Sequence, residues 1–170
     1  MIQPARIRAV IEAMATASTV KIIRAYQGQK HPGYPHGLYS VTGGDGQELH
    51  RRSTSYSVKV GDPNTVVKTS LETVKMNISL SFLGVNGPDE LYALAENARN
   101  WLVSQAGTDI CTAQKLIARL VGGITDRSVF MEQVFEQRVG FDFRLDGDSS
   151  ASEELPTVNT MSVNGRNLTL

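Results

Sequence analysis

The stretch that decides the fold is Val74-Lys75-Met76-Asn77-Ile78-Ser79-Leu80-Ser81-Phe82, in which apolar and polar residues alternate without a break. A period of two is the repeat of a β-strand, whose successive side chains point to opposite faces of a sheet. We therefore expect the apolar row to be buried and the polar row to face water or a partner. Burying each apolar side chain stabilises the fold by about 1.5–3 kcal/mol before chain entropy is counted, so a charge at Ile78 is expected to unfold the domain.

A second alternating segment runs from Phe135 to Leu145 and carries charge on one face. Its apolar row, interrupted by Gln137, is Phe135, Val139, Phe141, Phe143 and Leu145. Its charged row, interrupted by Gly140, is Glu136, Arg138, Asp142 and Arg144. Paired carboxylates for acid–base chemistry would need a cleft and a perturbed environment. The alternation of sign instead indicates pairing across strands or between subunits, so the four charged residues are a candidate protein interface.

Two amphipathic helices are expected beside these strands. The first begins near Pro4 and repeats apolar residues at the spacing of one helical face, at Ile7, Val10, Ile11 and Met14. The second is expected from Gly87 to a stop at Gly107, with an apolar stripe of Leu91, Leu94, Ala95, Ala98, Trp101 and Leu102. At 1.5 Å per residue this helix is about 25 Å long, which suits a helix that lies across a sheet.

Shorter elements are expected around these segments. The strands are expected at 20–26, 38–42, 51–60 and 116–121, the last of which enters a hairpin, with a weak strand at 157–163. Gly61-Asp62-Pro63-Asn64 is a strong turn signal, and the proline- and glycine-rich segment 28–37 predicts a loop. Residues 147–154 are polar and are expected to form a loop.

The pattern predicts an α+β fold. Strands and helices do not alternate at the spacing of parallel crossover units, which favours an antiparallel or mixed sheet flanked on one face by helices. The length suits a single domain over 1–170. Within it, the polar stretch 43–70 is expected to be an extended hairpin or arm, and 147–170 a C-terminal loop with a short strand.

Composition narrows the functional class. Lys plus Arg and Asp plus Glu both number 17, so the net charge is zero and the broad basic field of a non-specific nucleic-acid binder is missing. The single cysteine, Cys111, excludes an intramolecular disulfide and fits a reducing compartment. No segment approaches the roughly 20 apolar residues of a membrane span, and the first residues lack a signal-peptide pattern, so a soluble cytoplasmic protein is expected.

The residue types that carry chemistry in enzymes do not fall into a catalytic pattern. His31, His36 and His50 lack metal-ligand spacing and are expected to be solvated loop side chains. Gly43-Gly44-Asp45-Gly46 lacks the spacing of a phosphate loop and is expected to be a hairpin tip or turn. We therefore expect no catalytic residue, no metal and no cofactor. The basic pair Arg51-Arg52 could touch nucleic acid or an acidic partner, or be a solvated strand end, and it joins the candidate interface.

The order of these features resembles that of a known family. An amphipathic helix precedes the segment Pro32-Gly33-Tyr34-Pro35-His36-Gly37-Leu38-Tyr39, the alternating strand 74–82 and a Gly-Pro helix over 87–105. The charged strand Glu132-Gln133-Val134-Phe135-Glu136-Gln137-Arg138-Val139-Gly140-Phe141-Asp142-Phe143-Arg144 and a short C-terminal strand complete the order. The chain resembles the neck terminator, or tail terminator, proteins of tailed bacteriophages along nearly its whole length, and most closely over 132–144.

This resemblance implies a structural role in the virion. Such proteins form a ring, commonly of six subunits, that caps the head-proximal end of the tail tube, stops tube polymerisation and offers a docking surface to the head connector. The implied partners are other copies of the chain, tail tube and sheath proteins, and connector or neck proteins. DNA passes through the lumen without sequence-specific binding, and no membrane is involved. The protein would be made in the host cytoplasm and would reside in the tail or neck, and the family carries no catalytic residues.

Two alternatives stay open from the sequence. One is a different neck or tail component, such as a connector adaptor or a baseplate part, which the proteins it binds would distinguish. The other is a small α+β ligand-binding domain or enzyme, which would need a deep pocket lined by Cys111, His31 or His36.

Overall fold

The computed structural model describes residues 2–26, 32–44, 52–131, 134–156, 160–163 and 166–169. The helices in these ranges are α1 (Pro4–Ala17), α2 (Pro88–Val103) and α3 (Gln105–Ala113). The strands are β1 (Ile22–Arg24), β2 (His36–Gly44), β3 (Arg52–Lys59), β4 (Asp62–Gly84), β5 (Leu116–Asp126), β6 (Val129–Met131), β7 (Val134–Pro156), β8 (Thr160–Val163) and β9 (Arg166–Thr169).

The main sheet is mixed. Its strand order is β1-β2-β4-β7-β5, with β3 also pairing with β4 and β6 with β7. Strand β1 runs parallel to β2, whereas β2 and β3 pair antiparallel to β4, and β5 and β6 pair antiparallel to β7. Strands β8 and β9 form a separate antiparallel pair. Together with the helices this confirms the predicted α+β class.

The chain divides into two compact units. Unit 1 comprises Met1–Glu48 and Val74–Asp148, and unit 2 comprises Leu49–Thr73 and Ser149–Leu170. The two long strands, β4 and β7, each contribute residues to both units. That 1–170 acts as a single domain stays a prediction.

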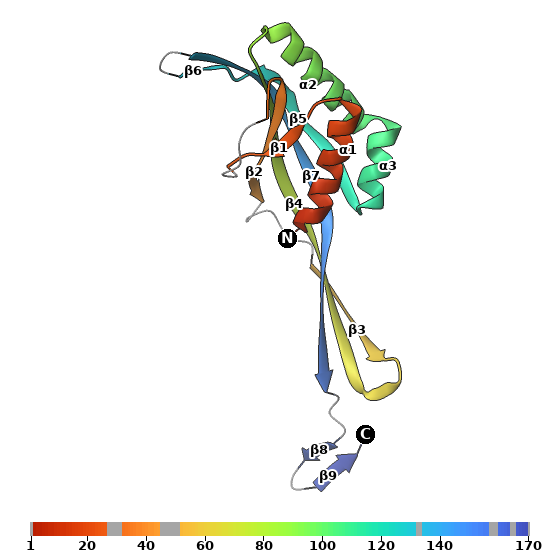
Figure 1. Cartoon of the computed structure of the whole chain (residues 1–170). Coiled ribbons are helices and arrows are strands. Elements are labelled where there is room, and N and C mark those ends of the chain that lie inside the picture. The colour runs from red at the N-terminus through yellow and green to blue at the C-terminus, as the bar shows by residue number, and fades with distance from the viewer. Residues whose placement is uncertain are drawn as a thin grey trace. The chain divides into compact units, whose positions relative to one another are not determined.

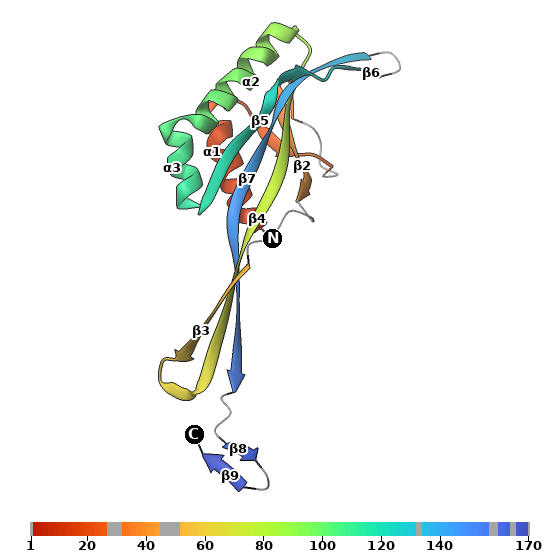
Figure 2. The same ribbon diagram turned by 180° about the vertical axis from the view of Figure 1, so that it is seen from behind.

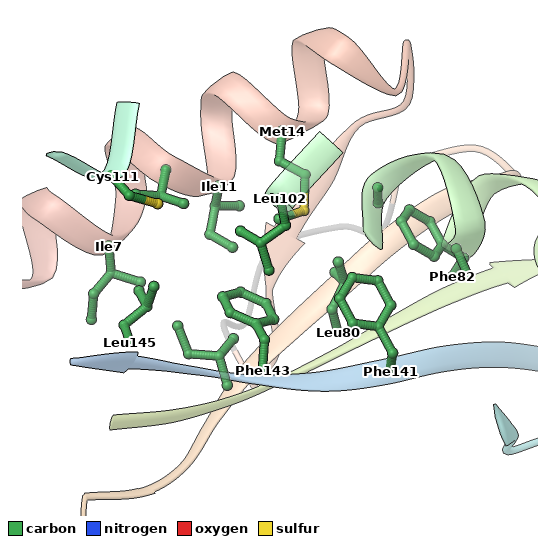
Figure 3. Packing of buried hydrophobic residues seen from close by; sticks show 14 of the residues in the cluster. Ile7, Ile11, Met14, Leu80, Phe82, Leu102, Cys111, Phe141, Phe143 and Leu145 are labelled. Carbon is green, nitrogen blue, oxygen red and sulfur yellow. The ribbon is translucent and has the colours of Figure 1, made fainter. Parts of the chain in front are cut away.

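In unit 1 the helices α1, α2 and α3 cover one face of the sheet (Figures 1 and 2). The predicted apolar faces meet there, with the apolar row of α1 and that of β4 from Met76 to Phe82 buried. Figure 3 shows Ile7, Ile11 and Met14 of α1 above Phe141, Phe143 and Leu145 of β7. Val139, Phe141, Phe143 and Leu145 have no exposed surface, which confirms the expected inward row at these four positions, while the side chain of Phe135 lies outside the described residues.

The prediction of one continuous helix from Gly87 to Gly107 is wrong, because the structure has two helices there, α2 and α3. Helix α2 stops at Val103, and Ser104 adopts an extended conformation before α3. The Ser104 hydroxyl donates to the Trp101 carbonyl oxygen at 2.7 Å and accepts the Gly107 N–H at 3.3 Å, so it ends one helix and begins the next. Gly107 is not a stop but the close contact at this corner, where a Cβ would lie 2.2 Å from the Trp101 carbonyl oxygen. The helical spacing of apolar residues continues across this corner, so the spacing alone does not predict the break between α2 and α3.

The two long strands extend beyond their apolar patterns into unit 2. Strand β4 begins at Asp62, so Pro63 and Asn64 belong to a strand and the predicted four-residue turn is wrong. The turn lies at Val60 and Gly61, where Gly61 supplies the positive φ of 86° that a tight turn needs. Likewise 147–154 is strand β7, not the expected loop. The sequence shows no apolar alternation over these polar segments of β4 and β7. They are strands because their backbones pair with neighbouring strands, which requires no buried face.

Strand β3 pairs with β4 in unit 2, from Arg52 opposite Glu72 to Val58 opposite Val66. Two ion pairs join this hairpin to β7, between Lys59 and Glu154 at 2.8 Å and between Lys68 and Glu153 at 3.6 Å. The hydrogen bond to Glu154 raises the pKa of Lys59 above its ordinary value. The expected strand at 51–60 is therefore present as β3, while the extended arm over 43–70 stays a prediction, since 45–51 lie outside the described residues.

Candidate functional site

The surface of interest is the uncovered face of the unit 1 sheet, opposite the helices. On β4, Ser79 and Ser81 point away from the core because they alternate with the buried Ile78, Leu80 and Phe82. Strand β2 places Ser40 beside Ser79 and Leu38 beside Ser81. On β7, Glu136, Arg138, Asp142 and Arg144 share this face, because they alternate with the buried row Val139–Leu145. We call this surface the open face.

Arg127 holds the centre of the open face together. It lies between β5 and β6, and its guanidinium donates to Ser79 Oγ at 2.7 Å, Ser81 Oγ at 3.3 Å and Asp142 Oδ1 at 2.9 Å. The Arg127 guanidinium therefore links the polar side of β4 to the polar side of β7. Sequence reasoning missed Arg127, because its partners Ser79, Ser81 and Asp142 are 15 to 48 residues distant in the chain and no local pattern marks it.

Glu136 organises a second cluster on the open face. Its carboxylate accepts hydrogen bonds from Arg138 Nε at 3.0 Å and from the Tyr34 hydroxyl at 3.1 Å. Partial burial, the largest influence, raises the pKa of Glu136, but the hydrogen bond and charge of Arg138 and the Tyr34 hydroxyl outweigh it and lower the pKa overall. Burial first, and then the bond to Glu136, raise the pKa of Tyr34. At neutral pH this cluster is an ionised carboxylate held by two donors.

Arg144 belongs to a third cluster, around Asp146. Arg119 Nε donates to Asp146 Oδ2 at 2.9 Å, and Arg144 Nη2 approaches the same oxygen at 3.5 Å. Arg144 Nε also lies 2.8 Å from Asp146 Oδ1. That contact is an ion pair only, because neither atom makes a hydrogen bond of acceptable angle. Two guanidinium groups thus share one nearly buried carboxylate.

The structure brings four of the predicted interface residues, Glu136, Arg138, Asp142 and Arg144, onto one face. Each is paired within the chain: Glu136 with Arg138, Asp142 with Arg127, and Arg144 with Asp146. The other two, Arg51 and the side chain of Arg52, lie outside the described residues. That the six form an interface stays a prediction.

A hollow of about 450 Å³ opens on the same face. Its polar lining comes from Ser40, Ser79 and Ser81 together with Arg24, Arg127 and Arg138. Its apolar lining comes from Ile23, Ala25, Leu38 and Leu83, with Tyr26 in the turn that follows β1. Arg24 is exposed and makes no hydrogen bond or ion pair in the described part of the chain, unlike Arg127 and Arg138. The hollow therefore combines an apolar surface with serine hydroxyls and with the ion-paired Arg127 and Arg138.

The residues on which an enzyme would depend lie elsewhere. His36 begins β2 and is only 1% exposed, with its ring centroid 5.3 Å from that of Tyr34, so the expectation of a solvated loop histidine is wrong for it. Its position opposite Leu83 in the pairing of β2 with β4 explains the burial. Cys111 is buried in the core, which raises the pKa of its thiol. Neither residue lines the hollow on the open face, and His31 and His50 lie outside the described residues.

Unit 2 carries a different kind of surface. Tyr56, Val58 and Val60 are 64%, 60% and 100% exposed, and Leu71 is 43% exposed. Tyr56 and Val58 lie on one face of the hairpin, opposite Lys68 and Val66. Apolar side chains exposed on strands are common at binding surfaces.

The fold and these surfaces define a small α+β protein whose polar, ion-paired sheet face in unit 1 lies opposite the helices. Among the described residues no group of three or more His, Cys, Asp and Glu could hold a metal ion, and no helix there is long and apolar enough to cross a membrane. Residues 5–168 match the family model of the phage neck terminator protein, so the chain belongs to that family. No curated protein matches the sequence. The family is structural, and its members are virion components that associate with other tail and head proteins of the phage.

Proposed function

We propose that this protein forms a ring, of six subunits, that caps the head-proximal end of the phage tail tube. The ring ends tube polymerisation and joins the finished tail to the connector of the filled head, and DNA passes through its lumen. Tail tube and sheath proteins on one side and connector proteins on the other are its partners. It assembles in the host cytoplasm. The match to the neck terminator family over residues 5–168 carries this proposal.

Two structural observations support it. The open face of unit 1 presents ion-paired side chains on a sheet that helices cover on the other side only. Unit 2 exposes Tyr56, Val58 and Val60 on the β3–β4 hairpin, and exposed apolar side chains that lie together commonly mark protein interaction sites. Both surfaces would gain by burial against other subunits.

The direct test mixes the purified protein with tail tube protein during tube assembly. Tubes should stop growing at a length set by the ratio of the two proteins, and negative-stain images should show six-fold rings at one tube end. Native mass spectrometry of the protein alone would give the subunit number. Binding at the baseplate end, or to the connector with no effect on tube length, would instead favour another tail or neck component.

The charged residues of the open face can be tested as part of the ring interface. Reversing either charge, by Arg138→Glu or Arg144→Glu, would set a carboxylate against Glu136 or Asp146 within the monomer and could destabilise the fold itself. Arg138→Gln and Arg144→Gln are therefore the cleaner variants, and should weaken ring formation in a chain that circular dichroism shows to be folded. If both variants still formed intact rings, Arg138 and Arg144 would not be part of the ring interface.

The predicted arm can be tested separately. Deleting 45–66 removes β3 and the turn, and should leave unit 1 folded while weakening attachment to tube or connector. The double change Tyr56→Ser and Val58→Ser is gentler, because both side chains are already exposed. Tail joining that is unchanged in both variants would show that this segment does not dock.

A further inference from the structure

We propose that copies of this chain join edge to edge in unit 2, where β3 of one copy pairs with residues 150–156 of β7 in the next. This inference rests on the proposed ring and names a contact that would build it. Within unit 2, β4 lies between β3 and β7 (Figures 1 and 2). Among the described residues, β3 pairs with β4 alone, and β5 pairs with β7 only as far as Gly147. The sheet of unit 2 therefore has two open edges, one on each side of β4.

Side-chain contacts show the direction of β7 in this unit. Lys68 of β4 forms its ion pair with Glu153, and the Thr69 hydroxyl lies 3.5 Å from that of Ser152. Because one residue number rises while the other falls, β7 runs antiparallel to β4 here, as β3 does on the other side. Strands β3 and β7 thus run in the same direction, with Ser55 and Ser152 at the same level, since both lie beside Thr69. Copies that repeat around an axis along these strands would bring β3 and β7 together as a parallel pair.

The open edges of unit 2 differ from the edges of unit 1. Exposed strand edges invite pairing with other chains, and proteins block them with very short strands, bulges or proline. In unit 1 the edge strand β1 has three residues, and the edge strand β5 has a register shift between Val121 and Thr125. In unit 2, β3 pairs with β4 without a shift from Arg52 to Val58, and residues 150–155 of β7 contain no proline. Unit 2 therefore leaves open the kind of edge that unit 1 blocks.

Charge favours pairing of β3 with β7 over pairing of like edges. The charged residues of β3, Arg52 and Lys59, are both basic and stand at its two ends. Those of residues 150–156, Glu153 and Glu154, are both acidic. A two-fold pair of β3 strands would set Arg52 of one copy near Lys59 of the other, and like charges on paired strands are destabilising. Lys59 and Glu154 pair within the chain but stay 42% and 58% exposed, so each can also meet the opposite charge of a neighbour.

The two edges also determine the kind of assembly. They are different surfaces of one chain, so their contact is heterologous and gives a closed ring when the rotation between copies closes. In such a ring the sheet of unit 2 is continuous, with three strands from each copy. The backbone N–H and C=O groups that point outward from β3 and from residues 150–156 would then be paired.

Disulfide formation between Ser55→Cys and Ser152→Cys tests the contact. Both residues are exposed and lie on the same face of the sheet as Thr69, but β4 separates them within one chain, and the native Cys111 is buried. Two strand spacings of about 4.8 Å each keep their Cα atoms beyond the roughly 7 Å that a disulfide can span, whereas adjacent strands of two copies allow the bond. On oxidation, a chain with both changes should give a ladder of oligomers that ends in one closed species. A mixture of the two single variants should give dimers, and neither single variant alone should.

The matched control is Thr54→Cys, which is exposed on β3 but points to the opposite face from Ser55. It should not link to Ser152→Cys. Ser53→Cys and Ser57→Cys point to the same face as Ser55 and cover a register that is shifted by two residues in either direction. Dimers of Ser55→Cys alone would indicate two-fold pairing of β3 and would overturn the proposed contact.

Hydrogen exchange of the unmodified chain gives a second readout. On assembly, exchange of backbone amides in β3 and in residues 150–155 should slow by roughly tenfold or more, because new strand pairing must open before exchange. The internal control is β4 from Met76 to Phe82, which β2 and β7 already flank on both sides and whose rates should not change. Rings that form without slower exchange in β3, or without any of these cross-links, would overturn the edge contact and leave the ring proposal standing. A wild-type chain that forms no ring, even with tube protein, would overturn both.

Discussion

Arg127 and Asp142 are joined by a 2.9 Å ion pair that links the β5–β6 connection to the polar side of β7. The same guanidinium also reaches the two β4 serines, so one side chain crosses the open face from strand to strand. Its place in the charged row of this strand makes Asp142 a candidate for contacts between subunits. In the folded chain it already has an internal partner, which gives the open face a fixed arrangement before any partner arrives.

Arg127→Ala should destabilise unit 1. The change leaves Asp142 without its cation and removes the bonds to Ser79 and Ser81, and because the site is partly exposed we expect a loss of about 1 kcal/mol. Arg127→Lys should recover little, since an ammonium group cannot reproduce the planar fork. Urea unfolding measures the loss, with Arg8→Ala on the exposed side of α1 as the matched control. Equal stability of the Ala variant and the wild type would contradict this role.

Gly140→Ala should be costly although the residue lies among charged side chains. A Cβ at this position would lie 2.1 Å from the Leu80 carbonyl oxygen and 2.8 Å from Ser81 Cα, so β4 and β7 must separate. Overpacking of this kind typically costs about 1–3 kcal/mol. The control is Gly123→Ala on β5, where a Cβ would meet no atom within 4 Å. Comparable melting temperatures for the two variants would show that the strands can adjust.

Ile78→Asp should unfold unit 1. Ile78 has no exposed surface, and an ionised carboxylate there would be buried without a partner. Circular dichroism and near-ultraviolet spectra should show loss of fixed packing at neutral pH. Val85→Asp, which changes an exposed apolar residue just after β4, should leave both spectra intact. A cooperative, native-like melt of Ile78→Asp would refute the assigned core.

Glu136 should make the stability of unit 1 depend on pH. Because folding lowers its pKa from the ordinary value of 4.5, the ionised carboxylate contributes stability at neutral pH, and that contribution is lost as the pH falls through the lowered pKa. Glu136→Gln should therefore destabilise by about 1 kcal/mol at pH 7 and progressively less in acid. Denaturant titrations of both chains across this range measure the difference. A gap that is independent of pH would rule out the charged pair as its source.

Much of unit 1 follows from sequence because its residues face one core. Strict alternation at 74–82, and alternation interrupted at Gln137 and Gly140 over 135–145, predict strands with one buried side, and the 3.6-residue repeat of α1 predicts that helix. These patterns are local, so they survive without any knowledge of neighbouring strands. The α2–α3 corner was missed because Ser104 and Gly107 act through contacts across a bend, while the apolar period runs through it.

Other features exist only through contacts between distant segments. The polar halves of β4 and β7 carry no apolar period, and pairing with neighbouring strands is what makes them strands. His36 reads as a loop residue in a segment rich in proline and glycine, but its strand position beside β4 buries it. The role of Arg127 and the position of the hollow could not be predicted from the sequence either, because both depend on contacts between distant segments.

The sequence by itself determined the α+β class, the inward rows of both long strands and the charged row at Glu136, Arg138, Asp142 and Arg144, because side-chain periodicity is a property of the local backbone. Tertiary structure alone decided which charges pair, through Arg127 and Asp146, and where the open face is hollowed. Ion pairs depend on distances of a few ångströms between strands, and no spacing along the chain encodes those distances.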